Sequence, residues 1–181
     1  MISLVIPHYP FDEEINKTLK KCVDSVLGYD ELILVVNDKI GFGKAVNQGL
    51  RIAKGDFICV MNNDVVMNKG SLKDLADPIR VTSPSVNDVR QPFWGCCFMI
   101  PRWVYDKVGG FDEQFEMGYF EDEDYIMKLK EAGIEMSCRA NINIVTQGGA
   151  TMYHLPDRAE IYARNQRKFE EKWGVSRPTQ R

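Results

Sequence analysis

Three short apolar runs limit the folds that this chain can adopt. Residues 2–6, 32–36 and 57–61 are continuous stretches rich in Val, Ile and Leu, a pattern typical of strands covered on both faces of a parallel sheet. Apolar residues at helical spacing follow Asp12, a candidate N-cap, and a second helical segment spans 44–53. The order strand, helix, strand, helix, strand predicts a βαβαβ unit, whose right-handed crossovers bring the C-terminal ends of the strands to one edge.

Polar side chains follow each of the three runs. They are His8 and Tyr9 after the first, Asn37 and Asp38 after the second, and Asn62, Asn63 and Asp64 after the third. Because ligands of open α/β sheets bind at this edge, the three strand ends together predict a binding site. The one carboxylate and two amides of residues 62–64 suit Mg²⁺ or Mn²⁺ shared with ligand phosphates, but an Asx turn that ends a strand explains them equally well.

The second helical segment begins with Gly41-Phe42-Gly43-Lys44. Backbone N–H groups at a helix start, with Lys44 beside them, can face a phosphate. The Walker pattern GxxxxGK[ST] is absent, and a plain tight turn is an equally good reading of these residues.

The rest of the chain predicts further elements of the same domain. We expect a loop at 77–91, a strand at 93–100, a short helix from Pro101 to Gly109, a helix at 121–132 that ends at Gly133, an edge strand at 142–145 and an amphipathic helix that reaches Trp173. One domain over 1–173 and a loose tail at 174–181 follow from this order.

Seven carboxylates fall between Asp112 and Asp124, in a run that also contains several aromatic residues. Acids in the first turn of a helix are stabilised by the helix dipole, and for Glu123 and Asp124 this explanation suffices. A carboxylate held beside Trp94, Tyr119 or Phe120 would instead be partly desolvated, which raises its pKa toward the range useful for a general base.

Two other aromatic or titratable positions have two readings each. Phe93-Trp94 fits core packing, and it also fits a platform for a sugar ring. His154, which follows a glycine-rich turn, is either structural or a ligand for a metal or a diphosphate.

Composition excludes several classes of function. The 181 residues carry a net charge of −3 and no long basic stretch, so unspecific nucleic-acid binding is not expected. The five cysteines show no CxxC spacing, which predicts reduced thiols and a cytoplasmic setting. We expect neither a signal peptide nor a membrane span, although peripheral contact with a membrane remains compatible with the composition.

Taken in order, these pieces resemble the family 2 glycosyltransferases with the GT-A fold, especially their rhamnosyltransferase-like and galactosyltransferase-like branch. The resemblance covers about residues 2–173. Its most specific stretches are residues 41–49 followed by 61–64, and residues 108–113 followed by 121–124.

The resemblance implies a single-domain α/β GT-A fold, the nucleotide-diphospho-sugar transferase fold, with a mostly parallel central sheet flanked by helices. It also implies an inverting, metal-dependent glycosyltransferase that uses Mn²⁺ or Mg²⁺. The donor would be a UDP, GDP or dTDP sugar, and the acceptor a hydroxyl of a glycan or of a lipid-linked or protein-linked saccharide.

The resemblance also implies roles for individual residues. Asp122 would be the catalytic base with Glu121 beside it, and Trp94 and Gly95 would lie near the acceptor. Asp64 would bind the metal together with Asn62 and His154. Donor-binding positions would be Pro7, His8, Tyr9, Asn37, Asp38, Lys44, Asn62 and Asn63.

Three features depart from the family pattern. Only two residues separate Asp38 from Gly41, where family members usually carry a further helix and strand. Asn62 replaces the first Asp of Asp-x-Asp, and Gln147 stands where many members have a histidine. A non-catalytic relative that binds only nucleotide or sugar is therefore an alternative. A nucleotidyltransferase is disfavoured, because no glycine-rich, Arg- or Lys-bearing signature follows the first strand.

Overall fold

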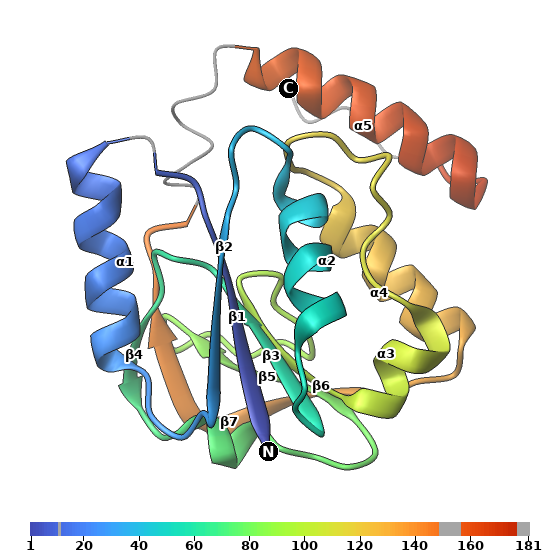
Figure 1. Cartoon of the computed structure of the whole chain (residues 1–181). Coiled ribbons are helices and arrows are strands. Elements are labelled where there is room, and N and C mark those ends of the chain that lie inside the picture. Colours follow the sequence, from blue (N-terminus) through green and yellow to red (C-terminus); the bar gives the residue numbers. More distant parts are fainter. Residues whose placement is uncertain (11, 149–156, 177–181) are drawn as a thin grey trace.

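The computed structural model describes residues 1–10, 12–148 and 157–176. A central sheet lies between two layers of helices, and a last helix crosses one end (Figure 1). The elements are β1 (Ile2–His8), α1 (Glu13–Ser25), β2 (Glu31–Val36), α2 (Phe42–Ile52), β3 (Phe57–Met61), β4 (Val66–Lys69), a 3₁₀ turn (Leu72–Leu75), β5 (Val81–Val86), β6 (Cys97–Pro101), α3 (Arg102–Val108), α4 (Glu121–Glu131), β7 (Met136–Val145) and α5 (Arg158–Trp173).

The strands of the described residues form one seven-stranded sheet in the order β2-β1-β3-β6-β5-β7-β4. β1 lies between β2 and β3 and is parallel to both, which confirms the βαβαβ unit. β5 and β7 are also parallel, whereas β3–β6, β5–β6 and β4–β7 are antiparallel. The α/β class is confirmed, and the sheet is mixed rather than mostly parallel.

The two faces of the sheet have separate cores. Val46 and Leu50 of α2, Val104 of α3 and Leu129 of α4 pack on one face, while Cys22 of α1 packs on the other with the 3₁₀ turn. These side chains are almost completely buried, and each large aliphatic one contributes about 1.5–3 kcal/mol relative to an exposed position. The two layers fix the direction of β1, β2 and β3, and therefore the place where their C-terminal ends meet.

Several predicted boundaries are confirmed at the atomic level. Asp12 caps α1, and its side-chain oxygen accepts a hydrogen bond from the Ile15 N–H at 2.9 Å. α3 begins after Pro101 and ends at Gly109, whose φ is +73°. α1 ends at Ser25, before the predicted stop at Gly28.

The predicted loop at 77–91 is wrong, because it contains β5. Its residues Thr82, Ser83 and Ser85 are buried, and their hydroxyls are satisfied inside the fold. Thr82 donates to the Leu75 carbonyl, and Ser85 donates to the Ile142 carbonyl at 2.7 Å. Pro84 lies where the register with β7 shifts, a position that tolerates the missing N–H. A strand made of hydroxyl residues and proline has no apolar alternation to reveal it.

The predicted edge strand at 142–145 is the end of a longer strand in the interior of the sheet. β7 starts at Met136 and lies between β5 and β4. The edge position belongs to β4, which the apolar pattern did not indicate because Asn68 and Lys69 dilute it. The predicted strand at 93–100 begins only at Cys97.

α5 rests on a third, smaller core. Phe169 of α5 packs with Phe115 and Phe120 from the segment between α3 and α4. The Phe120 and Phe169 rings lie 5.6 Å apart between centroids. This core confirms that the aromatic residues of the acidic run are buried.

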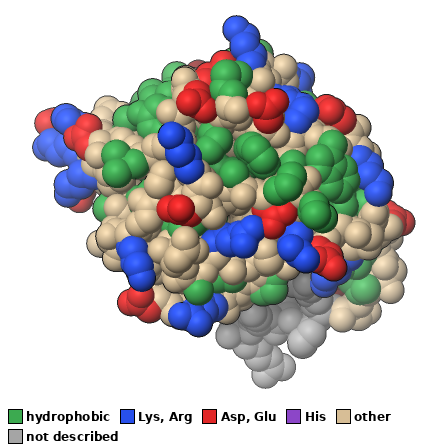
Figure 2. Space-filling view, turned by 90° about the horizontal axis from the view of Figure 1, so that it is seen from below, with side chains coloured by type: hydrophobic (Ala, Val, Ile, Leu, Met, Phe, Trp, Pro, Cys, Tyr) green, Lys and Arg blue, Asp and Glu red, His purple; other side chains and the backbone are tan. Residues whose placement is uncertain are grey.

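Figure 2 shows the end of the molecule opposite to the C-terminal ends of β1, β2 and β3. Basic, acidic and hydrophobic side chains are interspersed there, as far as the described residues show, and the terminal amino group contacts Asp56 at 2.7 Å. All five cysteines are free thiols, as predicted. Within the described ranges, no helix is both long enough and apolar enough to cross a bilayer.

Candidate active site

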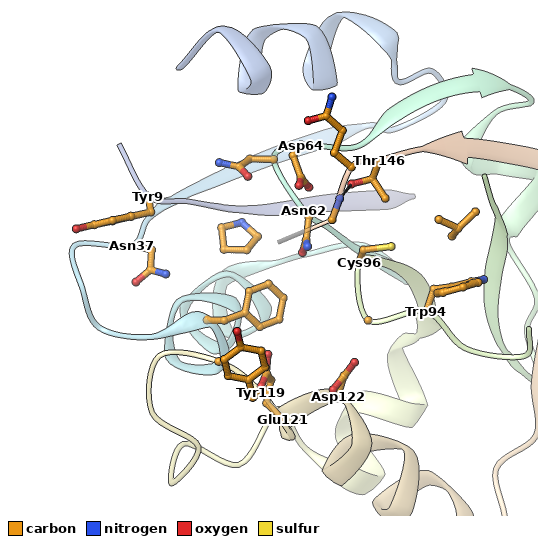
Figure 3. Close-up of a pocket in the computed structure, with 18 of the residues that line it drawn as sticks. Tyr9, Asn37, Asn62, Asp64, Trp94, Cys96, Tyr119, Glu121, Asp122 and Thr146 are labelled. Carbon is orange, nitrogen blue, oxygen red and sulfur yellow. Dashed lines mark hydrogen bonds between the residues drawn. The ribbon is translucent and has the colours of Figure 1, made fainter. Parts of the chain in front are cut away.

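A cavity of about 540 Å³ opens where the strands β1, β2 and β3 end (Figure 3). Asn62 and Asp64 lie on one side, and Glu121 and Asp122 lie across from them. Its volume falls within the range of small-molecule sites, about 300–1,000 Å³. The sheet edge predicted as a binding site is therefore hollow, and polar side chains line it among apolar ones.

The turn after β3 offers oxygen ligands to this cavity. Asn62 and Asp64 both line it, and Asn62 Oδ1 is buried without a hydrogen-bond partner in the described part of the chain. No three His, Cys, Asp or Glu side chains gather as a metal cluster among the described residues. One carboxylate and one unsatisfied amide oxygen nevertheless fit Mg²⁺ or Mn²⁺, which take few protein ligands and complete their shell with phosphates and water.

His8 supports this turn from behind. It is 7% exposed and does not line the cavity, although its neighbours Pro7 and Tyr9 do. The Asn63 amide contacts His8 Nδ1 at 2.8 Å, and His8 Nε2 contacts Asn16 Oδ1 of α1 at 2.8 Å. Both ring nitrogens are thus engaged within the protein, and His8 links α1 to the turn.

The strand end of β2 shapes the start of α2. Asn37 lines the cavity, and its Oδ1 accepts a hydrogen bond from the Gly41 N–H at 3.1 Å. Asp38 and Lys44 are exposed and do not line the cavity. Gly41 has a φ of +96°, and a Cβ there would lie 3.0 Å from the Met117 N. Residues near Met117 therefore cover the start of α2.

Glu121 and Asp122 begin α4 with different environments. Glu121 is 9% exposed; burial, and secondarily the charge of Asp122, raises its pKa from 4.5 to about 8. Its Oε2 has no hydrogen-bond partner in the described residues. Glu121 is therefore protonated at neutral pH and can donate a hydrogen bond.

Asp122 faces the cavity beside Gly95. Its Oδ1 accepts a hydrogen bond from the Glu123 N–H at 2.9 Å, which fixes the carboxylate. A Cβ on Gly95 would lie 2.7 Å from Asp122 Oδ2, so this close approach requires glycine. Trp94 is next along the wall, and its Nε1 is buried without a partner in the described residues. Trp94 packs on the core and also lines the cavity, and its role as a platform for a sugar ring stays a prediction.

Sequence reasoning missed two stretches of the wall. Met117, Gly118 and Tyr119 form one, and Val86, Asn87 and Val89 with residues 146–148 form the other. Asn87 joins the second stretch, because its amide donates to the Thr146 carbonyl and accepts from the Thr146 N–H, at 3.0 and 3.2 Å. Gln147 lines the cavity, whereas His154 lies outside the described residues. The missed residues carry no chemical signature and reach the cavity through loop geometry.

The sequence model of glycosyl transferase family 2 matches residues 32–141, more than half of the chain. The chain belongs to this family. No curated protein sequence matches it significantly.

Several solved structures of glycosyltransferases have a fold similar to that of this family member. The catalytic domain of Drosophila β1,4-galactosyltransferase 7, in complex with xylobiose, has a TM-score of 0.58 and 14% identity, over 76% of this chain and 63% of that one. S. aureus TarS in complex with UDP-GlcNAc has a TM-score of 0.63 and 16% identity, over 88% of this chain and 64% of that one. A Pyrobaculum calidifontis mannosyltransferase with GDP-Man and Mn²⁺ has a TM-score of 0.59 and 16% identity, over 84% of this chain and 59% of that one. The family member thus has the glycosyltransferase GT-A fold and spans less than two thirds of each of these chains.

The protonated state of Glu121 predicts how the stability of this family member changes with pH. Folded Glu121 keeps its proton up to about pH 8, whereas in the unfolded chain it releases it near 4.5. Between these values the folded state binds more protons, so the stability due to Glu121 falls as pH rises, by up to about 1.4 kcal/mol per pH unit. We expect Glu121→Gln to flatten this fall. Urea unfolding of the wild type and of Glu121→Gln at pH 6 and pH 8 gives the free energy of unfolding of each protein. If this free energy changed equally with pH in the two proteins, a raised pKa of Glu121 would be contradicted.

Proposed function

We propose that this chain transfers a sugar, with inversion, from a nucleoside-diphosphate donor to an acceptor hydroxyl. One observation carries the proposal: a single cavity joins the Asn62–Asp64 turn to the carboxyl pair at the start of α4. A turn suited to a phosphate-bound cation and a carboxylate suited to accept a proton are the two ends that such a reaction needs. Family membership supports the same chemistry.

The strand-end side of the cavity would hold the donor. Asp64 and Asn62 would bind Mg²⁺ or Mn²⁺, which when bound neutralises charge on the leaving diphosphate. Tyr9, Asn37 and Phe42 line the same end and supply an aromatic and amide surface for the nucleoside. Complexes of the fold neighbours with UDP-GlcNAc, and with GDP-Man and Mn²⁺, support a nucleotide-sugar donor.

The α4 side would activate the acceptor. Asp122 accepts the proton of the acceptor hydroxyl, whose oxygen forms the new bond to the anomeric carbon. The bond from that carbon to the diphosphate breaks at the same time, and its electron pair leaves with the diphosphate. Attack opposite to the leaving group inverts the anomeric configuration.

Two buried donors would orient the sugars during this step. Glu121 and Trp94 both line the cavity, and Glu121 Oε2 and Trp94 Nε1 are buried without a partner in the described part of the protein. Sugar hydroxyls can accept these hydrogen bonds, and leaving a buried donor unsatisfied costs about 1–3 kcal/mol. The proposed acceptor is a saccharide or glycoconjugate. The five free thiols favour a reducing, cytoplasmic setting.

The test is a panel of UDP, GDP and dTDP sugars with Mn²⁺, repeated with EDTA. A matching donor at 100 times its dissociation constant should stabilise the fold by about 2.7 kcal/mol, seen as a rise in melting temperature. Release of nucleoside diphosphate with Mn²⁺ and an acceptor, abolished by EDTA, would support the transferase. Binding without release would favour the non-catalytic alternative, and no binding of any donor would refute the proposal.

A further inference from the structure

The segment 116–120 forms part of the cavity wall and leads directly into Glu121 and Asp122. Three of its residues have backbone angles that side chains of their size rarely adopt: φ is +63° at Met117, +70° at Tyr119 and +70° at Phe120. Such angles persist only where the surrounding structure holds them. Phe120 is also the residue that caps α4, so its conformation sets the direction in which the helix starts.

Asn165 of α5 holds this segment. Its side chain is completely buried, and its amide nitrogen lies 3.0 Å from the Glu116 carbonyl, 2.7 Å from the Gly118 carbonyl and 3.3 Å from the Tyr119 carbonyl. The two amide hydrogens are thus shared among three carbonyl oxygens, which the left-handed backbone directs toward the Asn165 side chain. An amide is suited to this task, since it donates two hydrogen bonds without bringing a charge into the core.

α5 is in turn fixed to α4. The Trp173 indole donates to Asp124 Oδ1 at 2.9 Å, and the Lys172 ammonium contacts the same oxygen at 2.6 Å. Phe169 packs in the small core described above, between these contacts and Asn165. Figure 1 shows α5 lying across the segment that joins α3 to α4. Asn165 is therefore carried by a helix that is anchored to α4, the helix that begins with the carboxyl pair.

We propose that Asn165 is a positioning residue for the transfer reaction. It holds segment 116–120 in its left-handed conformation, and through that segment it sets where Glu121 and Asp122 face the cavity. The proposal rests on the proposed function, because Asn165 does not line the cavity and acts only through the carboxyl pair. A displacement of about 1 Å in a catalytic group can cost about 10²-fold in rate.

The experiment compares Asn165→Leu and Asn165→Asp with the control Gln166→Leu. Both Asn165 variants remove the amide donor; Asp keeps the shape and Leu avoids a buried charge, so one remains informative if the other does not fold. Gln166→Leu removes the neighbouring buried amide of α5, which donates to Glu170 Oε1 at 2.9 Å and, within the described residues, makes no hydrogen bond to segment 116–120. Hydrogen exchange of the peptide over 113–121 reports the segment, and kcat with the best donor reports the reaction.

We expect faster exchange of this peptide and a kcat lower by about 10²-fold in the Asn165 variants only. Gln166→Leu is expected to lower the melting temperature while its exchange in 113–121 and its kcat stay close to wild type. Unchanged exchange in the Asn165 variants would contradict the claim that Asn165 holds segment 116–120. Faster exchange with an unchanged kcat would contradict its positioning role. If the wild-type chain transferred no sugar, the proposed function would fail, and the exchange comparison would still decide whether Asn165 holds the segment.

Discussion

Asp122→Asn is expected to slow sugar transfer by about 10²–10⁴-fold, the usual contribution of a general base, while donor binding stays unchanged. Asn keeps the size of the side chain and its contact with Gly95, but it cannot take a proton. The strand-end wall that would hold the donor lies on the opposite side of the cavity, away from the substitution (Figure 3). Initial rates with a saturating donor, together with calorimetric donor titration, separate the two effects.

Glu123→Gln is the matched control for this experiment. It removes one negative charge from the same helical turn at a residue that does not line the cavity, and the weaker dipole interaction costs about 0.3–1 kcal/mol of stability. Turnover of Asp122→Asn within about threefold of the control would remove Asp122 from the role of base. Glu121→Gln is informative beside them, because Glu121 already carries a proton at neutral pH.

The first half of the fold was readable because its sequence obeys simple periodic rules. β1, β2 and β3 are apolar runs covered on both faces, and Asp12 caps α1 as its position suggested. The polar strand ends were expected to meet, since parallel strands with right-handed crossovers allow no other edge. Pro7, Tyr9, Asn37 and the turn 62–64 do line one cavity.

The second half was not readable in the same way. β5 is buried through hydroxyl groups that bond to neighbouring strands, and hydrophobic periodicity cannot see such a strand. The parallel pairing of β5 with β7 joins residues more than 50 positions apart, which no local pattern encodes. The same limit applies to Asn165, whose importance depends on a backbone conformation in a distant segment.

The acidic run shows how one sequence feature divides in three dimensions. The helix dipole does not suffice for Asp124, which is completely buried and bonded to Lys172 and Trp173. Asp112 contacts Lys172 at 2.6 Å, and this ammonium lowers the pKa of Asp112 although partial burial opposes it. The run is therefore partly an anchor for α5, and only residues 121 and 122 of its acids face the cavity.

Asp64→Asn is expected to abolish the Mn²⁺-dependent part of donor binding. Asn62 already replaces one carboxylate of the family pattern, so the turn 62–64 would be left without charge. A cation at the diphosphate supplies several kcal/mol of transition-state stabilisation, so we expect transfer to fall by about 10³-fold. Thermal shifts with nucleoside diphosphate, with and without Mn²⁺, give a readout that does not depend on turnover.

Two further variants make this result specific. Asp88→Asn removes one negative charge at an exposed residue that does not itself line the cavity, and its Mn²⁺-dependent shift should match wild type. Asn62→Asp replaces the buried Asn62 Oδ1, which is unsatisfied in the described structure, with a carboxylate oxygen, so it should increase the shift at low Mn²⁺ concentration. If Asp64→Asn retained the full Mn²⁺ effect, or if Asn62→Asp left it unchanged, the cation would have to bind elsewhere, and the donor end of the cavity would lose its assignment.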